Sequence, residues 1–537
     1  MYTQTVFENF KKHRLGYFSM YVILLFCLVG IYAPILASSK PLMVNYDGVW
    51  YFPLFRYLFF SGFYTKSLDL FFNLLMFTFP LMCLNYILFK NKKKIGLTIF
   101  LIILGFQFGL FLYLILSKPQ DPAQNKSLSQ ARQEVLQSGV KFQSFAFDLK
   151  YMTPYKKLNL LLNDKLLKRQ NDRLSAYKDV YEKNAMNRLM EMAARDKRGA
   201  LLRQGVALKD LPDLEELKIM GIKEIPENVL NAKIQIPTLW NTNQENQRQK
   251  IEQLTETLRD NPNNLSAKTS LKYIQDQNNW LNEHGAKLNN LVMPLVRDFH
   301  FEDDAGGEQN LNQTLPWWEL SRINRKDMLS ALIFGVRVSL VVGILAVGLS
   351  LLISIPIGSF SGYYGGTFDI ITSRLVEVLD AMPTFFMLLM IIAITQSKSI
   401  FLVISMIGLF GWTGFSRYIR GEFLKQRNLS YVQSCHALGF SNSYIMFSHI
   451  LPNAIPPLLT LLPFAMMGAI TAEAGLSFLG LGEEGSTSWG VLMDEGRSAF
   501  PAESYLLWPP AILLTTLLVA IALVGDALRD AIDPKMR

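Results

Sequence analysis

The sequence predicts an all-α protein that crosses a membrane several times. Half of its 537 residues are hydrophobic and only 18% are charged. The hydrophobic residues are gathered in runs, several of which reach about 20 residues, the length that a helix needs to span a bilayer. Lysine and arginine stand beside these runs, as they do at the cytoplasmic ends of membrane helices. Length, composition and charge placement therefore agree on a multi-pass membrane protein.

The net charge of +9 is best explained by topology. The basic residues cluster beside apolar runs, at 11–14, 90–94 and 417–427. Such clusters mark loops that stay in the cytoplasm, so we favour topology over nucleic-acid binding and expect no nucleic-acid partner. The three cysteines have neither a disulfide framework nor a zinc spacing.

The first predicted region, residues 1–117, contains three membrane helices. An apolar segment at 17–37 follows a short basic head, and it is longer than a typical signal-peptide core, so we favour an uncleaved helix. Further apolar runs lie at 67–89 and 95–117, separated by the basic turn KNKKK at 90–94. That turn predicts a cytoplasmic loop, which places the N-terminus inside and the end of the third helix outside.

Residues 118–328 form a polar insert with near-balanced charge and no spanning run. Thr153 followed by Pro154 is typical of a helix start. Leucines then recur at helical spacing over 158–166, and apolar seams with the same spacing continue over 251–281. We predict a mostly helical, hairpin-like domain outside the membrane, whose charged faces are more typical of solvent exposure than of a binding patch.

The third region, residues 329–537, is again hydrophobic and predicts five membrane helices. We place them near 334–358, 369–395, 399–416, 457–479 and 506–526. With the three N-terminal helices, they leave both termini in the cytoplasm. The same count places residues 411–457 inside, as the basic residues at 417–427 also indicate.

The polar stretch 411–457 is the most distinctive part of this region. Its pattern predicts two short helices joined at Gly439, because glycine permits a left-handed turn that a side chain would obstruct. Pro452 is expected to end the second helix and return the chain to the membrane. A rigid, basic helix pair on the cytoplasmic face is typical of a docking surface for a soluble partner.

Short motifs follow one another through the last third of the chain. They are GYYGG at 362–366, RLVEVLDAMP at 374–383, a glycine and Leu-Pro-Asn within 411–457, SFLGLG at 477–482, SWG at 488–490 and GDALRDAIDP at 525–534. In this order and spacing they resemble the permease subunits of bacterial ABC importers for oligopeptides and dipeptides (the OppC, DppC and YejE type). The resemblance covers 322–537 and extends to the aromatic segment 46–53. It implies a permease core of about six helices, with the helix hairpin at 67–117 and the insert as additions.

The same resemblance assigns a coupling role to the cytoplasmic loop. The family motif runs, loosely, Glu-Ala-Ala, three residues, Gly, and later Ile-x-Leu-Pro. The corresponding residues of this chain are Gln433, Ser434, Cys435, Gly439, Leu451 and Pro452. Gln433 cannot form the ion pair that a glutamate offers, although it can still form hydrogen bonds. The resemblance implies that these residues couple the chain to an ATPase.

Three carboxylates are candidates for the translocation path or its gate. Glu377 and Asp380 share one helix face with Arg374. A structural Arg374–Glu377 pair at the cytoplasmic interface is an equally good interpretation. Glu473 is the stronger candidate, because it lies deep in the predicted span 457–479, where a carboxylate is costly and faces a protein interior or a water-filled path. Internal packing is its alternative role.

Catalysis by this chain is not indicated. The GxGxxG match at 480–485 follows a membrane helix rather than a strand, and no Walker A, HExxH or GxSxG motif occurs. We therefore expect no cofactor or metal in the chain, with ATP bound by partner subunits. The resemblance implies a homologous second permease, two cytoplasmic ATP-binding subunits and an extracytoplasmic substrate-binding protein, at the bacterial inner membrane.

The sequence thus predicts the permease subunit of an ATP-driven importer, with oligopeptides as the expected substrate. The alternative is a membrane-anchored scaffold that acts through its extracytoplasmic helical insert. Two departures from the family pattern keep it open: Gln433, and the segment 321–327, which retains Asp327 but lacks the family's glycine-rich sequence. A self-contained channel is disfavoured by the coupling loop.

Overall fold

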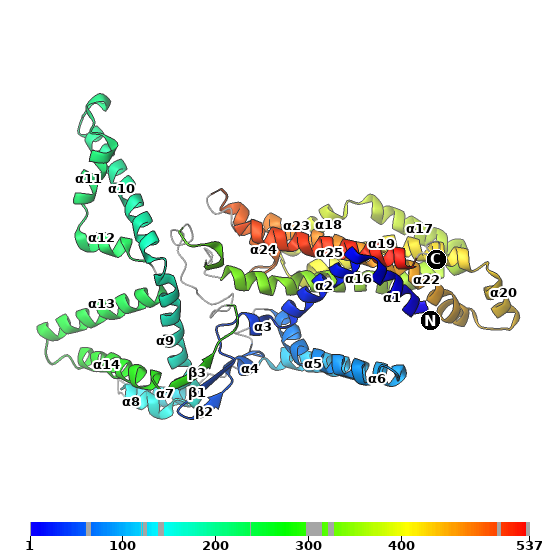
Figure 1. The fold of residues 1–537 in the computed structure, drawn as a ribbon, viewed down its shortest axis with the longest axis horizontal. Helices are drawn as coiled ribbons and strands as arrows, with labels where there is room; N and C mark the ends of the chain where they lie inside the picture. The colour runs from blue at the N-terminus through cyan, green and yellow to red at the C-terminus, as the bar shows by residue number, and fades with distance from the viewer. Residues whose placement is uncertain are drawn as a thin grey trace. The chain divides into compact units, whose positions relative to one another are not determined.

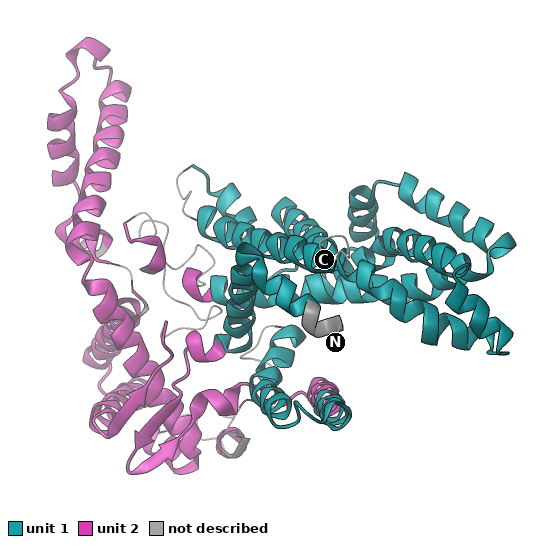
Figure 2. Cartoon of the chain, turned by 45° about the vertical axis from the view of Figure 1, so that its right-hand side comes forward, with its two compact units in different colours: residues 1–33, 65–104, 332–537 teal, residues 34–64, 105–331 magenta. Residues whose placement is uncertain are grey.

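The computed structural model is almost entirely helical, with one small sheet (Figure 1). It describes residues 2–60, 66–119, 121, 126–137, 144–236, 238–296, 314–319, 327–501 and 506–532. The chain divides into two compact units (Figure 2). Unit 1 comprises residues 1–33, 65–104 and 332–537, and unit 2 comprises residues 34–64 and 105–331.

Within the described residues, seven helices are long and apolar enough to cross a membrane. They are α2 (Arg14–Ile31), α5 (Ser67–Leu88), α6 (Lys93–Ser117), α16 (Met328–Tyr364), α19 (Ile400–Gln426), α23 (Leu462–Leu476) with the π-helical turn Ser477–Leu481, and α25 (Trp508–Ile532). The bent pair of α17 (Gly366–Ala381) and α18 (Thr384–Thr395) supplies an eighth span if it is counted as one. These positions confirm the multi-pass helical architecture that the apolar runs predict.

The membrane span predicted near 369–395 is formed by two helices and not by one continuous helix. α17 ends at Ala381, Met382 is extended (φ −88°, ψ 124°), and Pro383 precedes α18. A proline ring disfavours the helical conformation in the residue before it, and proline has no N–H to continue the helix. The axes of α17 and α18 consequently differ by 77°.

The prediction that Pro452 ends a helix is also wrong. α21 (Asn442–Tyr444), the π-helical turn Ile445–Ile450 and α22 (Leu451–Leu459) follow one another without a break. Pro452 lies in the first turn of α22, directly after the wider π turn. The wider turn makes room for the proline ring, which would otherwise clash with a carbonyl of the preceding turn. The chain leaves the helix only at Thr460, so the predicted span 457–479 is divided between α22 and α23.

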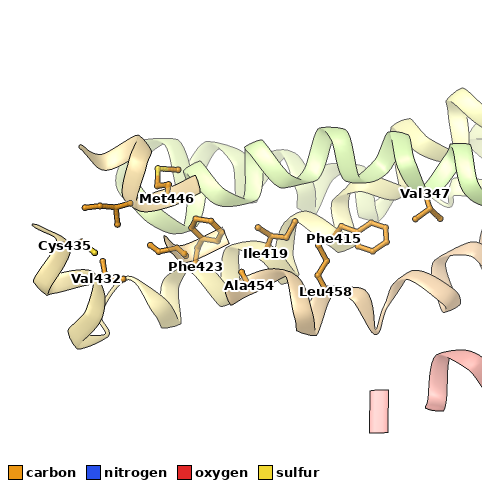
Figure 3. Packing of buried hydrophobic residues seen from close by; sticks show 11 residues of the cluster. Val347, Phe415, Ile419, Phe423, Val432, Cys435, Met446, Ala454 and Leu458 are labelled. Atoms are coloured by element: carbon orange, nitrogen blue, oxygen red, sulfur yellow. The ribbon is translucent and has the colours of Figure 1, made fainter. Parts of the chain in front are cut away.

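A hydrophobic cluster holds the two short helices of the 411–457 loop against the membrane helices of unit 1. Phe415, Ile419 and Phe423 of α19 contact Val432 and Cys435 of α20 (Ser430–Ala437) and residues of the π turn and α22. Figure 3 shows these side chains along one continuous seam. Because α20 and the π turn that directly follows α21 both contribute buried residues, the loop is a packed part of the unit.

A buried arginine joins three helices of unit 1. Arg337 of α16 is fully buried, and its guanidinium bonds to Asp69 Oδ1 (2.9 Å) and Asn73 Oδ1 (3.0 Å) of α5. Its Nε donates to the carbonyl oxygen of Gly30 in α2 (2.7 Å). A charge at this depth requires such partners. The ion pair therefore fixes α5 to α16.

Unit 2 contains an antiparallel sheet of three strands in the order β2–β1–β3. The strands are β1 (Met43–Tyr46), β2 (Val49–Tyr51) and β3 (Leu288–Val292). The turn between β1 and β2 is Asp47-Gly48, with both residues at positive φ, which is a typical hairpin turn. Val44 and Leu288 of the sheet pack with Leu158, Leu161 and Leu162 of α9 (Pro154–Ser175) to form a core.

The rest of unit 2 is helical. Its longer helices are α7 (Lys126–Gln137), α8 (Phe145–Tyr151), α9 (Pro154–Ser175), α10 (Lys178–Arg203), α11 (Leu214–Lys223), α12 (Glu227–Ile234), α13 (Leu239–Asp260) and α14 (Leu265–Gly285). α9 begins as predicted, since the Thr153 side chain caps the Lys156 N–H at 3.2 Å and Pro154 occupies the first turn. Residues 321–326 of the altered segment 321–327 lie outside the described residues.

The remaining helical segments are short or lie at the ends of the longer ones. They are α1 (Tyr2–Lys12) and α24 (Trp489–Ser498) in unit 1, and α3 (Ala33–Leu36), α4 (Pro53–Tyr57) and the 3-10 turns Leu208–Asp210 and Trp317–Glu319.

Candidate functional site

The turn between α20 and α21 has the left-handed geometry that its glycine predicts. Gly439 has φ +78°. Its N–H donates to the His436 carbonyl (3.0 Å), and the Phe440 N–H donates to the Cys435 carbonyl (3.2 Å). These two bonds form a Schellman motif, the usual helix ending with glycine in the left-handed conformation. The motif fixes the direction in which the chain leaves α20.

The residues that replace the family's Glu-Ala-Ala face in different directions. Cys435 is buried in the hydrophobic cluster, whereas Gln433 and Ser434 are exposed. Gln433 Nε2 donates to the Asn428 carbonyl (3.3 Å), and the Ser434 hydroxyl donates to the Ser430 carbonyl (2.9 Å). The outer face of α20 therefore presents polar side chains, while its inner face is part of the packing of unit 1.

Large apolar side chains are exposed around the Gly439 turn. Leu438 is 73% exposed, Phe440 42% and Tyr444 49%. The Phe440 ring lies 5.2 Å from that of Tyr444, measured between centroids. Sequence reasoning missed this apolar surface, although two large apolar residues beside a loop glycine were a usable signal, because loops are normally polar.

Leu451 and Pro452 begin α22, which carries the loop into the membrane helices. Leu451 packs at the edge of the hydrophobic cluster, and Pro452 is exposed. A displacement of the α20–α21 pair would therefore reach α22 through continuous helix as well as through the cluster.

The predicted carboxylates near the α17 terminus have separate partners. Glu377 pairs with Arg374 at 2.6 Å on an exposed surface, which fits the structural interpretation of that pair. Asp380 instead forms an ion pair with Arg417 of α19. The structure thus attaches α17 to α19 through Asp380, a contact that the sequence spacing does not indicate.

Glu473 is buried, at 4% exposure, in α23. Its Oε1 accepts hydrogen bonds from the hydroxyls of Ser477 (2.7 Å) and Ser488 (2.6 Å). Ser488 also caps α24 by accepting from the Gly490 N–H (3.2 Å), and the Trp489 indole donates to the Leu332 carbonyl (3.1 Å). Glu473 therefore holds the loop that leads from the end of α23 to α24. Sequence reasoning identified the carboxylate but not its serine partners.

The GxGxxG match at 480–485 begins within the π-helical turn Ser477–Leu481 at the end of the α23 span, and it does not follow a strand. Among the residues that the structure describes, no group of three or more His, Cys, Asp or Glu side chains could hold a metal ion.

The structure thus defines a helical, multi-pass membrane protein whose loop between α19 and α22 carries an exposed apolar turn. Residues 354–537 match the family model described as the binding-protein-dependent transport system inner membrane component. Residues 2–52 match the N-terminal TM domain of oligopeptide transport permease C.

Several bacterial permease proteins are similar to this chain in sequence. The peptidoglycan transport system permease protein YejE of Agrobacterium fabrum is 37% identical over 39% of this chain, which spans 55% of that relative's length. The oligopeptide transport system permease protein OppC of Haemophilus influenzae is 32% identical over a match that covers 46% of this chain and 80% of that relative's length. The inner membrane ABC transporter permease protein YejE of Escherichia coli is 34% identical over a match that covers 40% of this chain and 63% of that relative's length. The chain belongs to the OppC-type permeases of binding-protein-dependent transport systems.

Proposed function

We propose that this chain is the permease subunit of an ATP-driven importer that moves oligopeptides across the bacterial inner membrane. The observation that carries the proposal is the α20–α21 pair, which combines an exposed apolar turn with an inner face packed on the membrane helices. A displacement of such a pair by a bound soluble protein would be transmitted to the membrane helices on which it packs. Family membership supplies the expected source of the displacement, a cytoplasmic ATPase.

The coupling residues take distinct parts in this proposal. Gln433, Ser434 and the exposed apolar side chains beside Gly439 face the ATPase. Cys435 anchors α20 in the hydrophobic cluster, and Leu451 and Pro452 pass the displacement into α22. Because ATP is bound by two separate partner subunits, the chain needs no nucleotide site or other cofactor of its own.

A second, homologous permease would complete the path. The helices of one such core are too few to enclose a peptide-sized passage alone. The gate proposed for this chain is the loop held by Glu473 and Ser488, with Glu377 and Asp380 near the inner end of the path. In this account Glu473 acts by holding the loop between α23 and α24, rather than by contacting the peptide.

The basic segments set the orientation in this proposal. Lysines at 11–12 and 90–94 and the arginines and lysine at 417–427 place their loops and both termini in the cytoplasm. The polar helices and sheet of unit 2 then lie outside the inner membrane, where an extracytoplasmic substrate-binding protein delivers its cargo.

Oligopeptides are the proposed substrate because the names of the relatives converge on peptide-containing molecules. The Haemophilus relative is named for oligopeptides and the Agrobacterium relative for peptidoglycan, a polymer with peptide side chains. The direct test uses the complex purified through this chain and reconstituted into proteoliposomes with its binding protein. ATP-dependent accumulation of members of a mixed peptide library supports the proposal, and accumulation without ATP or of no peptide contradicts it.

A role for unit 2 in seating the binding protein is a further part of the proposal. In the sequence, α10, α11 and α12 are inserted between α9 and α13, and α9 and α13 contact each other directly in the structure. Replacing 178–235 with a short Gly-Ser linker would therefore remove these helices and leave the sheet and its leucine core in place. Unchanged affinity for the binding protein would refute a seating role for the deleted helices.

The alternative function, a membrane-anchored scaffold, is favoured by one observation: unit 2 is compact and has its own core. A scaffold does not depend on the coupling turn. Its partners should therefore bind equally well to the wild type and to a Gly439→Val variant, whereas the importer should lose peptide uptake in that variant.

A further inference from the structure

The end of α16 is bonded directly to both coupling helices through Tyr363. The Tyr363 hydroxyl donates to Asn442 Oδ1 of α21 (3.0 Å) and lies 3.2 Å from His436 Nε2 of α20. Because the hydroxyl has one proton, His436 Nε2–H is the donor when Asn442 accepts. The Tyr363 and His436 rings also stack, with an interplanar angle of 23°. One side chain thus contacts both members of the pair.

The backbone at the C-terminal end of α16 is hydrogen-bonded to the end of α19. Arg427 Nη1 donates to the carbonyls of Gly362 and Tyr363, both at 3.2 Å. These are among the last carbonyls of α16, which have no partner within the helix. At Gly362 a Cβ would come within 2.6 Å of the Arg420 carbonyl oxygen, so the close approach of α16 to α19 depends on this glycine.

α17 is attached to the same body at both of its ends. Gly365 and Gly366, both at positive φ, turn the chain from α16 into α17. Asp369 in the first turn bonds to Arg420 Nη2 (2.7 Å) and to the Ser361 hydroxyl. Near the other end, Asp380 pairs with Arg417. The next interruption is the break at Met382 and Pro383, where the chain bends by 77°.

We propose that Tyr363 is a positioning residue through which the coupling pair moves the end of α16 and α17 as one block, with the break before α18 as the joint. This inference rests on the proposed function, which supplies the ATPase that displaces the pair. The block consists of α17, α20, α21 and the adjoining ends of α16 and α19. The helix beyond the joint, α18, is expected to change its angle to the block during transport.

Removing the Tyr363 hydroxyl separates a transmitting role from a packing role. Tyr363→Phe keeps the ring that stacks on His436 and deletes both hydrogen bonds. Tyr364→Phe is the matched control: its ring stacks on Phe360, and its hydroxyl has no bonded partner among the described residues. Both variants are expected to assemble with the partner subunits as the wild type does.

The readout is the number of peptides imported per ATP hydrolysed by the complex in proteoliposomes. Tyr363→Phe is expected to lower this ratio about tenfold, the size of effect that loss of one to two hydrogen bonds produces, while the basal ATP hydrolysis rate stays unchanged. Tyr364→Phe is expected to keep the wild-type ratio. Adding Asn442→Ala to Tyr363→Phe should lower the ratio no further, because the bond is already absent.

The possible results are distinguishable. A wild-type ratio in Tyr363→Phe, with import intact, would overturn this inference and leave the proposed function standing. A wild-type complex that imports nothing with ATP would overturn the proposed function and the inference together. Equal losses in Tyr363→Phe and Tyr364→Phe would also overturn the inference, since only one of the two hydroxyls contacts the coupling pair.

Discussion

Replacing Gly439 with valine should damage coupling through backbone strain alone. Gly439 has φ +78°, and a Cβ built there meets no atom within 4 Å. A steric clash with neighbouring residues is therefore absent, and the cost is that of placing an L-residue in the left-handed region, roughly 1–2 kcal/mol and more for a β-branched side chain.

That strain competes with the two Schellman hydrogen bonds. They are worth about 0.5–1.5 kcal/mol each, so the turn either keeps its geometry at a loss or opens and redirects Leu438 and Phe440. A destabilisation of about 2 kcal/mol changes a two-state equilibrium by up to about 30-fold. We expect Gly439→Val to reduce binding of the ATPase by an amount approaching that factor, with normal insertion into the membrane.

Two matched variants show whether strain is the cause. Gly421 of α19 is exposed, has no positive φ, and a Cβ there also meets nothing within 4 Å. Gly421→Val is therefore expected to bind the ATPase as the wild type does. Gly439→Asn should retain part of the binding, because asparagine tolerates the left-handed region. Affinity is measured by titrating the purified ATPase against each variant in detergent, and wild-type affinity in Gly439→Val would refute the reasoning.

Further predictions concern the buried groups of the two units. Asp69→Ala removes the carboxylate that compensates the buried Arg337 charge and should lower the free energy of unfolding in detergent by about 3–5 kcal/mol. Adding Arg337→Met should restore most of the loss, and a double variant no more stable than Asp69→Ala would contradict the ion pair. Glu473→Gln keeps an acceptor for Ser477 and Ser488, whereas Glu473→Ala should lower the free energy of unfolding by about 1–3 kcal/mol. Glu473→Gln should therefore be the more stable variant in thermal unfolding. Equal losses in the two variants would contradict the role of Glu473 in holding the loop between α23 and α24. In unit 2, burial and a hydrogen bond to Asp148 raise the pKa of Tyr273 to about 12. The folded protein therefore holds this proton more tightly than the unfolded chain, so its contribution to stability is complete below about pH 10 and is lost as the pH rises toward 12. The measurement is the phenolate absorbance of the wild type and of Tyr273→Phe as the pH is raised. The difference between the two curves is the signal of Tyr273, and it should titrate near pH 12. A difference that titrates near pH 10, the ordinary tyrosine value, would exclude the buried hydrogen bond.

Local signals in the sequence predicted the membrane helices and the coupling turn. A span requires only a long apolar run, and the left-handed turn at Gly439 depends on one residue that lacks a side chain. The break at Pro383 was also visible as a local signal, because proline restricts the residue before it, but the apolar run across it suggested one continuous helix. The hairpin turn Asp47-Gly48 was a similar missed signal.

Contacts between distant residues could not be predicted from spacing. β3 pairs with β1 across more than 200 residues of chain, and no local pattern specifies that register. The partners of Asp380 and Glu473, Arg417 and Ser488, lie on other elements. Pro452 shows the same limit in another form, since the π turn that accommodates it depends on packing around Ile445, Met446 and Ile450.

Purification of the tagged chain from its native host in mild detergent, followed by mass spectrometry of the bound proteins, tests the central claim most directly. The importer account predicts a second permease and a Walker A ATPase in the wild-type and Gly421→Val preparations, with the ATPase depleted in Gly439→Val. Absence of both partners from the wild type, with soluble extracytoplasmic proteins bound equally to all three preparations, would contradict the account and favour the scaffold.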